Sequence, residues 1–247
     1  MAYDHFGAPI KSTEVALAPF ADSVESSESH SVSERVSMKP VTTLPAVRVA
    51  SSHVRDPMLA ATNLASELSH EHLGCVLFFC SAEYDLGRLG IALEHVFDGV
   101  RVSGCTSAGE ITPEGYGRGC ITAIGFDRRY FSIECALISE LEHFTLHDAQ
   151  GVIDGLLSTC RDAGLASVKG NTFAITLLDG LSSREELVLA TLNAALGTIP
   201  QFGGSAGDDE RLANTHVFFE GRFDTGAATV MLVNTPLDFR VFSPHHM

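Results

Sequence analysis

A serine flanked by glycines is the first feature of this sequence whose residue types could do chemistry. Gly203, Ser205 and Gly207 form the pattern G-x-S-x-G inside the segment FGGSAGDD, residues 202–209. In serine hydrolases this pattern builds a nucleophile elbow, a strained turn from a strand into a helix that exposes the serine for acyl transfer. A serine hydrolase that uses Ser205 is therefore one hypothesis for this chain.

The residues around Ser205 do not supply the rest of a hydrolase site. Only the eight residues DDERLANT separate Gly207 from the strand expected at His216, which leaves no room for the helix of a nucleophile elbow. A related turn earlier in the chain has Cys105 where the elbow needs its first glycine. We therefore expect that the chain is not an enzyme, and the hydrolase remains only as an alternative.

The glycines have a second interpretation, in which the turn binds a ligand. Gly203, Gly204 and Gly207 allow the backbone to approach another group closely. Amides exposed in such a turn, together with the Ser205 hydroxyl, would hold a carboxylate or another small polar ligand. A tight connection that binds nothing is the remaining interpretation.

This turn has a counterpart earlier in the chain. A shift of 98 residues places Ser107-Ala108-Gly109-Glu110 on Ser205-Ala206-Gly207-Asp208. The same shift lays an expected strand at residues 75–82 on another at 173–180. Such a match of residues and elements indicates an internal duplication.

The duplication also sets the expected fold. The shift lays a pair of strands within residues 119–138 approximately on residues 217–236, so the pseudo-repeats are about 75–138 and 173–236. The fold class is therefore α/β, with two duplicated strand–helix–strand–hairpin halves that form mixed β-sheets covered by helices. We expect the two glycine-rich turns to converge and bind a small ligand where the halves meet.

Local patterns predict the individual elements. Apolar alternation and apolar runs predict strands at residues 46–54, 75–82, 100–110, 119–126, 131–138, 172–180, 216–223, 226–235 and 239–242. Two hairpins are expected: the turn DRRY joins the strands at 119–126 and 131–138, and a second hairpin joins the strands at 216–223 and 226–235.

Capping residues predict where helices begin. Asp56 and Pro57 supply an N-cap and a first-turn proline for the helix that follows. Thr145 is the expected N-cap of a helix at residues 146–162. Ser182 and Glu185 have the spacing of a capping box.

Composition limits the classes of partner. The formal net charge is -15 and the sequence pI is about 5.0, so nucleic acid would be repelled. No stretch approaches the roughly 20 apolar residues that span a bilayer, so we expect no membrane insertion. Residues 1–45 are rich in serine and glutamate and are expected to be a disordered tail.

The cysteines and the N-terminus favour a cytoplasmic location. The six cysteines form no C-x-x-C motif, and Cys75, Cys80, Cys120 and Cys135 lie in apolar runs where free thiols pack as small hydrophobes. The N-terminus has no basic start followed by an apolar run, unlike a secretory signal. A reducing cytoplasm fits this pattern.

The residues also resemble a known family. The segments VLFFCSAEYD, VRVSGCTSAGEITPEGY and FGGSAGDD, followed by HVFFEGRFDTGAATVMLVN, are similar to the N-terminal part of the FIST sensory domain. The resemblance implies a FIST N-type sensory domain over residues 46–242, in bacterial signal transduction. Residues 243–247 would then be a tail or the start of a C-terminal FIST portion. Amino acids or other small molecules are the ligands that the family implies.

One branch of the FIST family adds a cofactor to this expectation. The chain resembles haem proteins that sense nitric oxide and regulate a partner histidine kinase or a cyclic-di-GMP enzyme. In DFRVFSPHHM, residues 238–247, the resemblance places the haem iron ligand at His246, with His245 as the neighbouring alternative. A neutral imidazole can hold haem iron and leave the other face open to a diatomic gas.

The resulting site prediction gathers the two turns. The residues expected to contact the ligand are Gly104, Cys105, Ser107, Gly109, Gly203, Gly204, Ser205, Gly207 and Asp208.

Other polar residues have two interpretations each. Cys105 either faces the ligand or packs in the core. Asp179 and Glu83, just after equivalent strands, either bind a ligand amine or complement a helix N-terminus. His143 and His147 are either a metal-chelating pair or, if Thr145 caps the helix between them, an ordinary surface pair.

Overall fold

The computed structural model describes residues 45–209 and 213–241, which belong to one compact unit, residues 43–247. The expected tail before residue 45 and the histidines at 245 and 246 lie outside the described residues.

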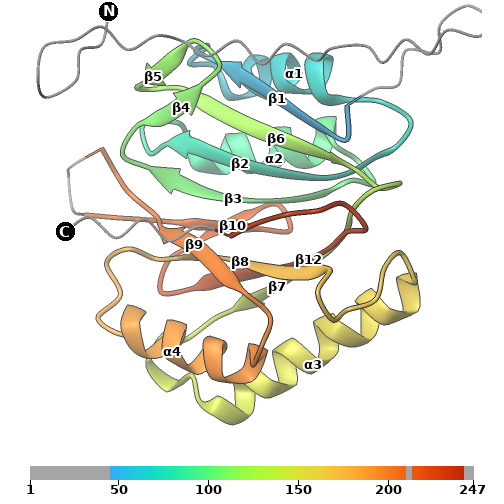
Figure 1. Cartoon of the computed structure of the whole chain (residues 1–247). Helices are drawn as coiled ribbons and strands as arrows, with labels where there is room; N and C mark the ends of the chain where they lie inside the picture. The colour runs from blue at the N-terminus through green and yellow to red at the C-terminus, as the bar shows by residue number, and fades with distance from the viewer. Residues whose placement is uncertain (1–44, 210–212, 242–247) are drawn as a thin grey trace, which may run out of the picture. The chain divides into compact units, whose positions relative to one another are not determined.

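Two β-sheets face each other, and each carries two helices on its outer side (Figure 1). The first sheet has the strand order β1 (Val47–Ser52), β6 (Ile121–Asp127), β2 (Leu73–Ser81), β3 (Arg101–Ser107), β10 (Val217–Phe219), β11 (Arg222–Asp224). The second has the order β7 (Ser132–Ile138), β12 (Ala228–Asn234), β8 (Thr172–Leu178), β9 (Gln201–Ser205). A separate hairpin is formed by β4 (Glu110–Thr112) and β5 (Gly115–Gly117).

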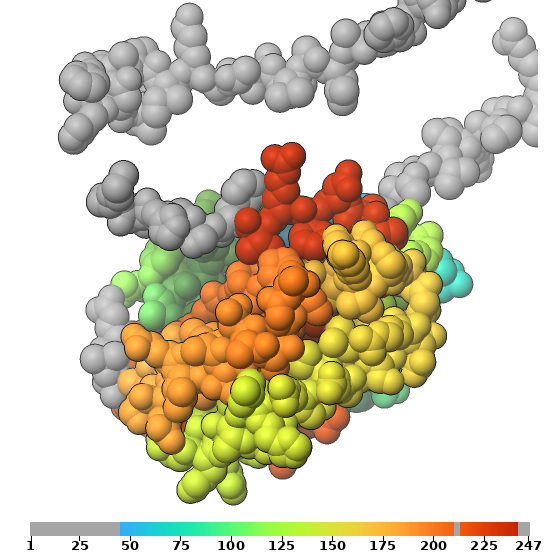
Figure 2. All heavy atoms as spheres, turned by 60° about the horizontal axis from the view of Figure 1, so that its bottom comes forward, coloured from blue at the N-terminus to red at the C-terminus, as the bar shows by residue number. Residues whose placement is uncertain are grey.

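The helices complete a four-layer α-β-β-α arrangement. Helices α1 (Pro57–Leu68) and α2 (Leu86–Val96) pack on the first sheet, and α3 (Leu146–Ala163) and α4 (Glu185–Leu196) pack on the second. Figure 2 views the molecule from the side of α3 and α4, which form its outer layer there. A short 3-10 helix, Leu141–His143, precedes α3. The α/β class expected from the sequence is therefore confirmed.

Central strands are apolar on both faces because each face meets a different layer. In β2, Val76 and Phe78 point to the core beneath α1 and α2. Cys75 and Leu77 point instead to the core between the sheets. A strand buried on both sides appears in the sequence as a continuous apolar run rather than an alternation, as the segment CVLFFC does.

Both sheets contain the same four-strand pattern. In β1-β6-β2-β3 the successive pairings are antiparallel, antiparallel and parallel. The pairings in β7-β12-β8-β9 follow the same sequence. Each half thus runs strand–helix–strand–helix–strand, then an inserted hairpin, then a final strand. The inserted hairpin is β4–β5 in the first half and β10–β11 in the second. The structural repeat therefore begins at β1 and β7, one strand earlier than the 98-residue shift suggests.

The two expected hairpins are wrong. Strands β6 and β7 follow one another in sequence but belong to different sheets, because β7 pairs with β12. The second hairpin is formed by β10 and β11, while β12 crosses to the other sheet. Residues 239–241 are not a strand, and residue 242 lies outside the described part of the chain.

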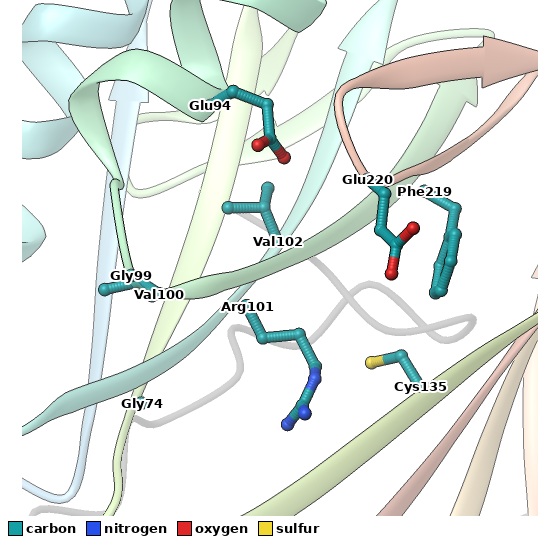
Figure 3. Close-up of a pocket in the computed structure, with 9 residues that line it drawn as sticks. All are labelled: Gly74, Glu94, Gly99, Val100, Arg101, Val102, Cys135, Phe219 and Glu220. Atoms are coloured by element: carbon teal, nitrogen blue, oxygen red, sulfur yellow. The ribbon is translucent and has the colours of Figure 1, made fainter.

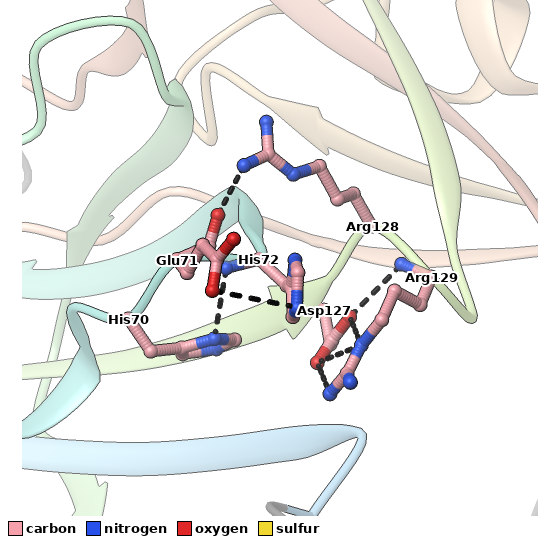
Figure 4. A network of polar contacts seen from close by, with 6 residues as sticks. All are labelled: His70, Glu71, His72, Asp127, Arg128 and Arg129. Carbon is pink, nitrogen blue, oxygen red and sulfur yellow. Dashed lines mark hydrogen bonds and ion pairs between the residues drawn. The ribbon is translucent and has the colours of Figure 1, made fainter.

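A buried carboxylate fixes the connection between β6 and β7. Asp127 accepts hydrogen bonds from the backbone N–H of Arg129 at 2.9 Å and from its guanidinium at 2.6 Å (Figure 4). These bonds lower the pKa of Asp127. Phe126 and Phe131 meet edge to face at 5.2 Å on either side of the turn. The turn therefore carries the chain from one sheet into the other.

Candidate functional site

The two glycine-rich turns are in direct contact. The backbone N–H of Gly207 donates to the carbonyl oxygen of Thr106, with an N···O distance of 2.9 Å. A Cβ atom placed on Gly207 would lie only 2.7 Å from the nitrogen of Ala108. The expected convergence of the turns is thus confirmed, and it requires glycine at position 207.

Each turn ends in a buried acidic residue that holds the turn against neighbouring parts of the protein. The carboxylate of Glu110 accepts hydrogen bonds from the Ser107 hydroxyl at 2.9 Å, the Cys120 amide at 3.3 Å and the Cys120 thiol at 3.1 Å. Asp208 accepts from the amides of Ala213 at 2.6 Å and Asn214 at 2.9 Å. Because other groups of the protein occupy these carboxylates, both acids hold the loops in place.

Asp179 and Glu83 also have protein partners. Asp179 is buried and accepts hydrogen bonds from the Leu181 amide at 3.0 Å, the Thr215 hydroxyl and the Gly226 amide. Glu83 forms an ion pair with Arg55 at 3.6 Å. These contacts support a structural role for Asp179, which connects β8 to the chain on both sides of the β10–β11 hairpin.

Ser205 is not placed as a nucleophile. Its hydroxyl donates to the carboxylate of Glu185 at the start of α4. Residues 206–208, which follow β9, are neither helix nor strand. The predicted capping box is also wrong, because the N-cap residue of α4 is Arg184 and Glu185 binds Ser205 instead of the helix N-terminus.

Cys105 and Gly104 lie in the core. Cys105 is 2% exposed between the two sheets, and burial raises the pKa of its thiol to about 12. A Cβ on Gly104 would lie 2.4 Å from the carbonyl oxygen of Phe78. Neither residue is accessible to a ligand, so the packing interpretation of Cys105 holds.

Two separate cavities open beside the turns. The first, which we call the hairpin cavity, has a volume of about 610 Å³. It is lined by Val49, Phe79, Ser107, Gly109, Glu110, Ile111, Thr112, Pro113, Thr122 and Ile124. The second, the β9–α4 groove, has a volume of about 590 Å³. It is lined by Leu178, Glu185, Leu189, Ala190, Asn193, Gln201, Phe202, Gly203, Gly204 and Ser205.

The cavities divide the predicted ligand residues. Ser107 and Gly109 line the hairpin cavity. Gly203, Gly204 and Ser205 line the β9–α4 groove. The remaining predicted residues, Gly104, Cys105, Gly207 and Asp208, line neither. The turns pack against each other, so neither cavity combines the two turns as the sequence prediction required.

Most of the chain matches one known family. Residues 74–247 match the FIST N domain. The chain belongs to the FIST family. FIST domains are sensory, small-ligand-binding modules of signal transduction rather than a catalytic family. No curated protein matched the chain. The match begins at β2, yet β1 and α1 are integral parts of the first sheet and its helical layer in this FIST protein.

A third cavity of this FIST protein lies at the opposite ends of the strands. It has a volume of about 430 Å³, and Figure 3 shows Arg101 of β3, Cys135 of β7 and Glu220 of the β10–β11 turn facing it. Arg101 forms an ion pair with Glu134 at 2.9 Å, and Glu94 also lines the cavity. Because carboxylates outnumber the single guanidinium, this cavity does not suit an anionic ligand.

The described residues form neither a metal-binding cluster nor a membrane-spanning helix. Among the described residues, no group of three or more His, Cys, Asp or Glu side chains is arranged to hold a metal. His143 belongs to the 3-10 helix and His147 to α3, and the Thr145 capping box separates them. No helix in the described ranges is long and apolar enough to cross a membrane.

Proposed function

We propose that this FIST domain senses a small, largely apolar organic molecule in the hairpin cavity. The observation that carries the proposal is that apolar side chains line a cavity directly beside the Ser107–Glu110 turn. Its volume of about 610 Å³ lies within the range of roughly 300–1,000 Å³ that is typical of small-molecule sites. Apolar walls with a few polar groups are also typical of such sites.

The lining indicates the chemistry of the ligand. Val49 and Ile111 are 49% and 81% exposed, so a bound apolar group would remove their surface from water. Thr112 and Thr122 also line the wall, but their hydroxyls already donate to the carbonyl oxygens of Gly115 at 2.9 Å and Ala50 at 3.4 Å, so neither has a free donor for a polar ligand. The Glu110 carboxylate is already occupied by Ser107 and Cys120, which disfavours a ligand that needs a free anion.

The proposed output is the regulation of a signalling enzyme. The family resemblance supports a bacterial sensor that acts on a partner histidine kinase or a cyclic-di-GMP enzyme. All six cysteines are free and five are buried, which suits a reducing compartment such as the cytoplasm.

A charged substitution at the cavity wall tests the proposal. The V49K variant should weaken binding of any ligand found by a thermal-shift screen at least about tenfold, because it places an ammonium group in an apolar site. The matched control is V47K, since Val47 lies two residues earlier on the same strand, is 39% exposed and does not line the cavity. Equal binding by both variants and the wild type would refute this site.

A haem-based nitric oxide sensor is the second candidate. The residues that line the hairpin cavity include no His, Cys or Met, so they offer no iron ligand and the assignment rests on His246 or His245. One contact favours the C-terminal segment as part of a site. The ring centroids of Phe239 and Phe173 are 4.7 Å apart, and those of Phe173 and Phe202 of β9 are 5.6 Å apart. The C-terminal segment therefore packs on an aromatic surface.

Absorption spectra test the haem hypothesis separately. The protein reconstituted with haem should show a Soret band that shifts when nitric oxide is added. The band should be lost or altered in H246A, or in H245A if the neighbouring residue is the ligand. A spectrum unchanged in both variants would exclude both histidines as iron ligands.

A further inference from the structure

Strand β9 is the exposed edge of the second sheet. All five of its residues are exposed or half-buried, from Gln201 to Ser205. Its topological counterpart in the first sheet, β3, is buried at five consecutive positions because β10 pairs with its outer side. Within the described residues the second sheet ends at β9, so the position equivalent to β10 is open.

The backbone of β9 presents hydrogen-bonding groups on this open side. The ladder to β8 runs from Ala174 N–H to Pro200 O at 2.8 Å through Ala206 N–H to Leu178 O at 2.7 Å. Alternate residues of a parallel pair point to opposite sides. The N–H and C=O groups of Gln201, Gly203 and Ser205 therefore point away from β8.

The first sheet shows what occupies such a position. Strand β10 pairs antiparallel with β3, so that Phe218 lies opposite Gly104. The Phe218 ring packs at 5.1 Å on Phe78, and a Cβ on Gly90 of α2 would lie 3.5 Å from this ring. A large aromatic side chain thus fills the space between β3 and α2.

The β9–α4 groove is the equivalent space in the second sheet. Gly203 lies opposite Thr176 of β8, as Gly104 lies opposite Phe78 of β2. The groove runs between β9 and the apolar side chains of Leu189 and Ala190 on α4. Figure 2 shows orange atoms of this part of the chain at the surface. We propose that this groove binds an extended segment of a partner protein as an antiparallel strand on β9.

The register and the charge define the segment. An apolar side chain opposite Gly203 would enter the groove, as Phe218 does in the first sheet. The residue opposite Ser205 would precede it by two positions, just as His216, whose carbonyl accepts from Thr106 N–H at 2.9 Å, precedes Phe218. Glu185 lies beside Ser205, so a Lys or Arg at this position gains an ionic partner. The motif is basic–any–large apolar.

Charge also favours a partner of different composition over a second copy of the chain. The formal net charge is -15, so two copies joined at this edge would repel each other. Strand addition to a sheet edge beside a helix is a known mode of peptide recognition, in which main-chain bonds give affinity and alternate side chains give specificity. This inference concerns a surface separate from the hairpin cavity and does not depend on the ligand proposed there.

A displayed library of random nine-residue peptides, selected on the whole protein, tests the inference. Enriched peptides should share the basic–any–large apolar motif. A synthetic consensus peptide should bind about tenfold or more weakly to A190F, which fills the groove, and several-fold more weakly to E185Q. The controls are S158F on α3 and E67Q on α1, both exposed and outside the groove, and these should bind as the wild type does.

Hydrogen exchange locates the bound peptide at single-residue resolution. The amides of Gly203 and Ser205 should gain protection on binding, whereas those of Phe202 and Gly204 already donate to β8. A library that yields no binder, or peptides that bind A190F as well as the wild type, would overturn the inference. So would protection confined to the hairpin cavity. Concentration-dependent dimerisation that A190F abolishes would assign the edge to a second copy instead.

Discussion

The backbone N–H of Gly207 donates to the carbonyl oxygen of Thr106 at 2.9 Å, and this bond joins the loop after β9 to strand β3 of the other sheet. The contact leaves no room for a side chain, since a Cβ on Gly207 would lie 2.7 Å from the nitrogen and 3.0 Å from the Cβ of Ala108. We expect G207A to lower the free energy of unfolding by about 1–3 kcal/mol through overpacking. Urea denaturation monitored by circular dichroism measures the loss.

A second glycine in the same segment provides the control for this substitution. A Cβ on Gly204 would have no atom within 4 Å. G204A should therefore keep the stability of the wild type or raise it by up to about 1 kcal/mol, because alanine restricts the unfolded chain. Equal destabilisation by both substitutions would show that the contact between the turns is not the cause.

Burial predicts the reactivity of the cysteines. Cys135 is the half-buried cysteine and lines the third cavity, whereas the other five are buried. Burial raises the pKa of Cys105 and Cys120 to about 12, so their thiolate forms are scarce near neutral pH. Ellman's reagent should label one thiol in the native protein and all six after unfolding. C135S should remove the native reaction, and rapid labelling of C135S would contradict the packing described here.

Local sequence signals were sufficient for most elements of the fold. The Asp56 side chain accepts from the Leu59 amide at 3.0 Å, and Thr145 and Asp148 form a capping box, because such caps depend only on neighbouring residues. The convergence of the two turns was also predictable, since equivalent elements precede each turn. The sequence match between Ser107 and Ser205 carried that information.

Pairings between distant segments could not be predicted in the same way. The turn from Asp127 to Tyr130 is compatible with a hairpin, but β7 pairs with β12, about 100 residues later in the chain, and no local pattern encodes that choice. The predicted capping box at Ser182 failed for a related reason. Glu185 meets the Ser205 hydroxyl, 20 residues away, and this contact replaces the local one.

The sequence did not predict the hairpin cavity, because the residues that form its walls come from separate strands and a hairpin. Val49 of β1 reaches the cavity only because β1 pairs with β6, which places Val49 opposite Ile124. Ile111 and Pro113 arrive from the β4–β5 hairpin. The only signal in the sequence was apolar residues next to the predicted turn, in the segment GEITPEG.

Ser205 gives a direct test of the hydrolase alternative. Because its hydroxyl donates to Glu185 rather than to an imidazole, Ser205 does not form the Ser–His pair of a typical serine hydrolase. A fluorophosphonate probe should not label the protein, and hydrolysis of an activated ester should be the same for the wild type and S205A. Labelling that S205A abolishes would restore the hydrolase hypothesis. The substitution itself should cost no more than about 1 kcal/mol, the value of one exposed hydrogen bond.

His216 predicts how stability depends on pH. Burial lowers the pKa of His216 from its ordinary value of 6.5, although Asp179, Asp208 and Asp224 act in the opposite direction. The Nδ1 atom of His216 is buried without a hydrogen-bond partner in the described structure, as expected for a neutral ring. As pH falls through 6.5, the unfolded chain takes up a proton before the folded protein does, so stability is lost until the lower folded pKa is passed.

A comparison with H216N isolates this contribution from the other histidines. The free energy of unfolding of the wild type minus that of the variant should be constant above about pH 7.5 and should fall as the pH drops below the ordinary histidine pKa of 6.5. Chemical denaturation at a series of pH values measures the difference. A difference that grows on acidification would mean that the three nearby carboxylates outweigh burial and raise the pKa. The loop that joins β9 to β10 would then hold a charged imidazolium among those acids.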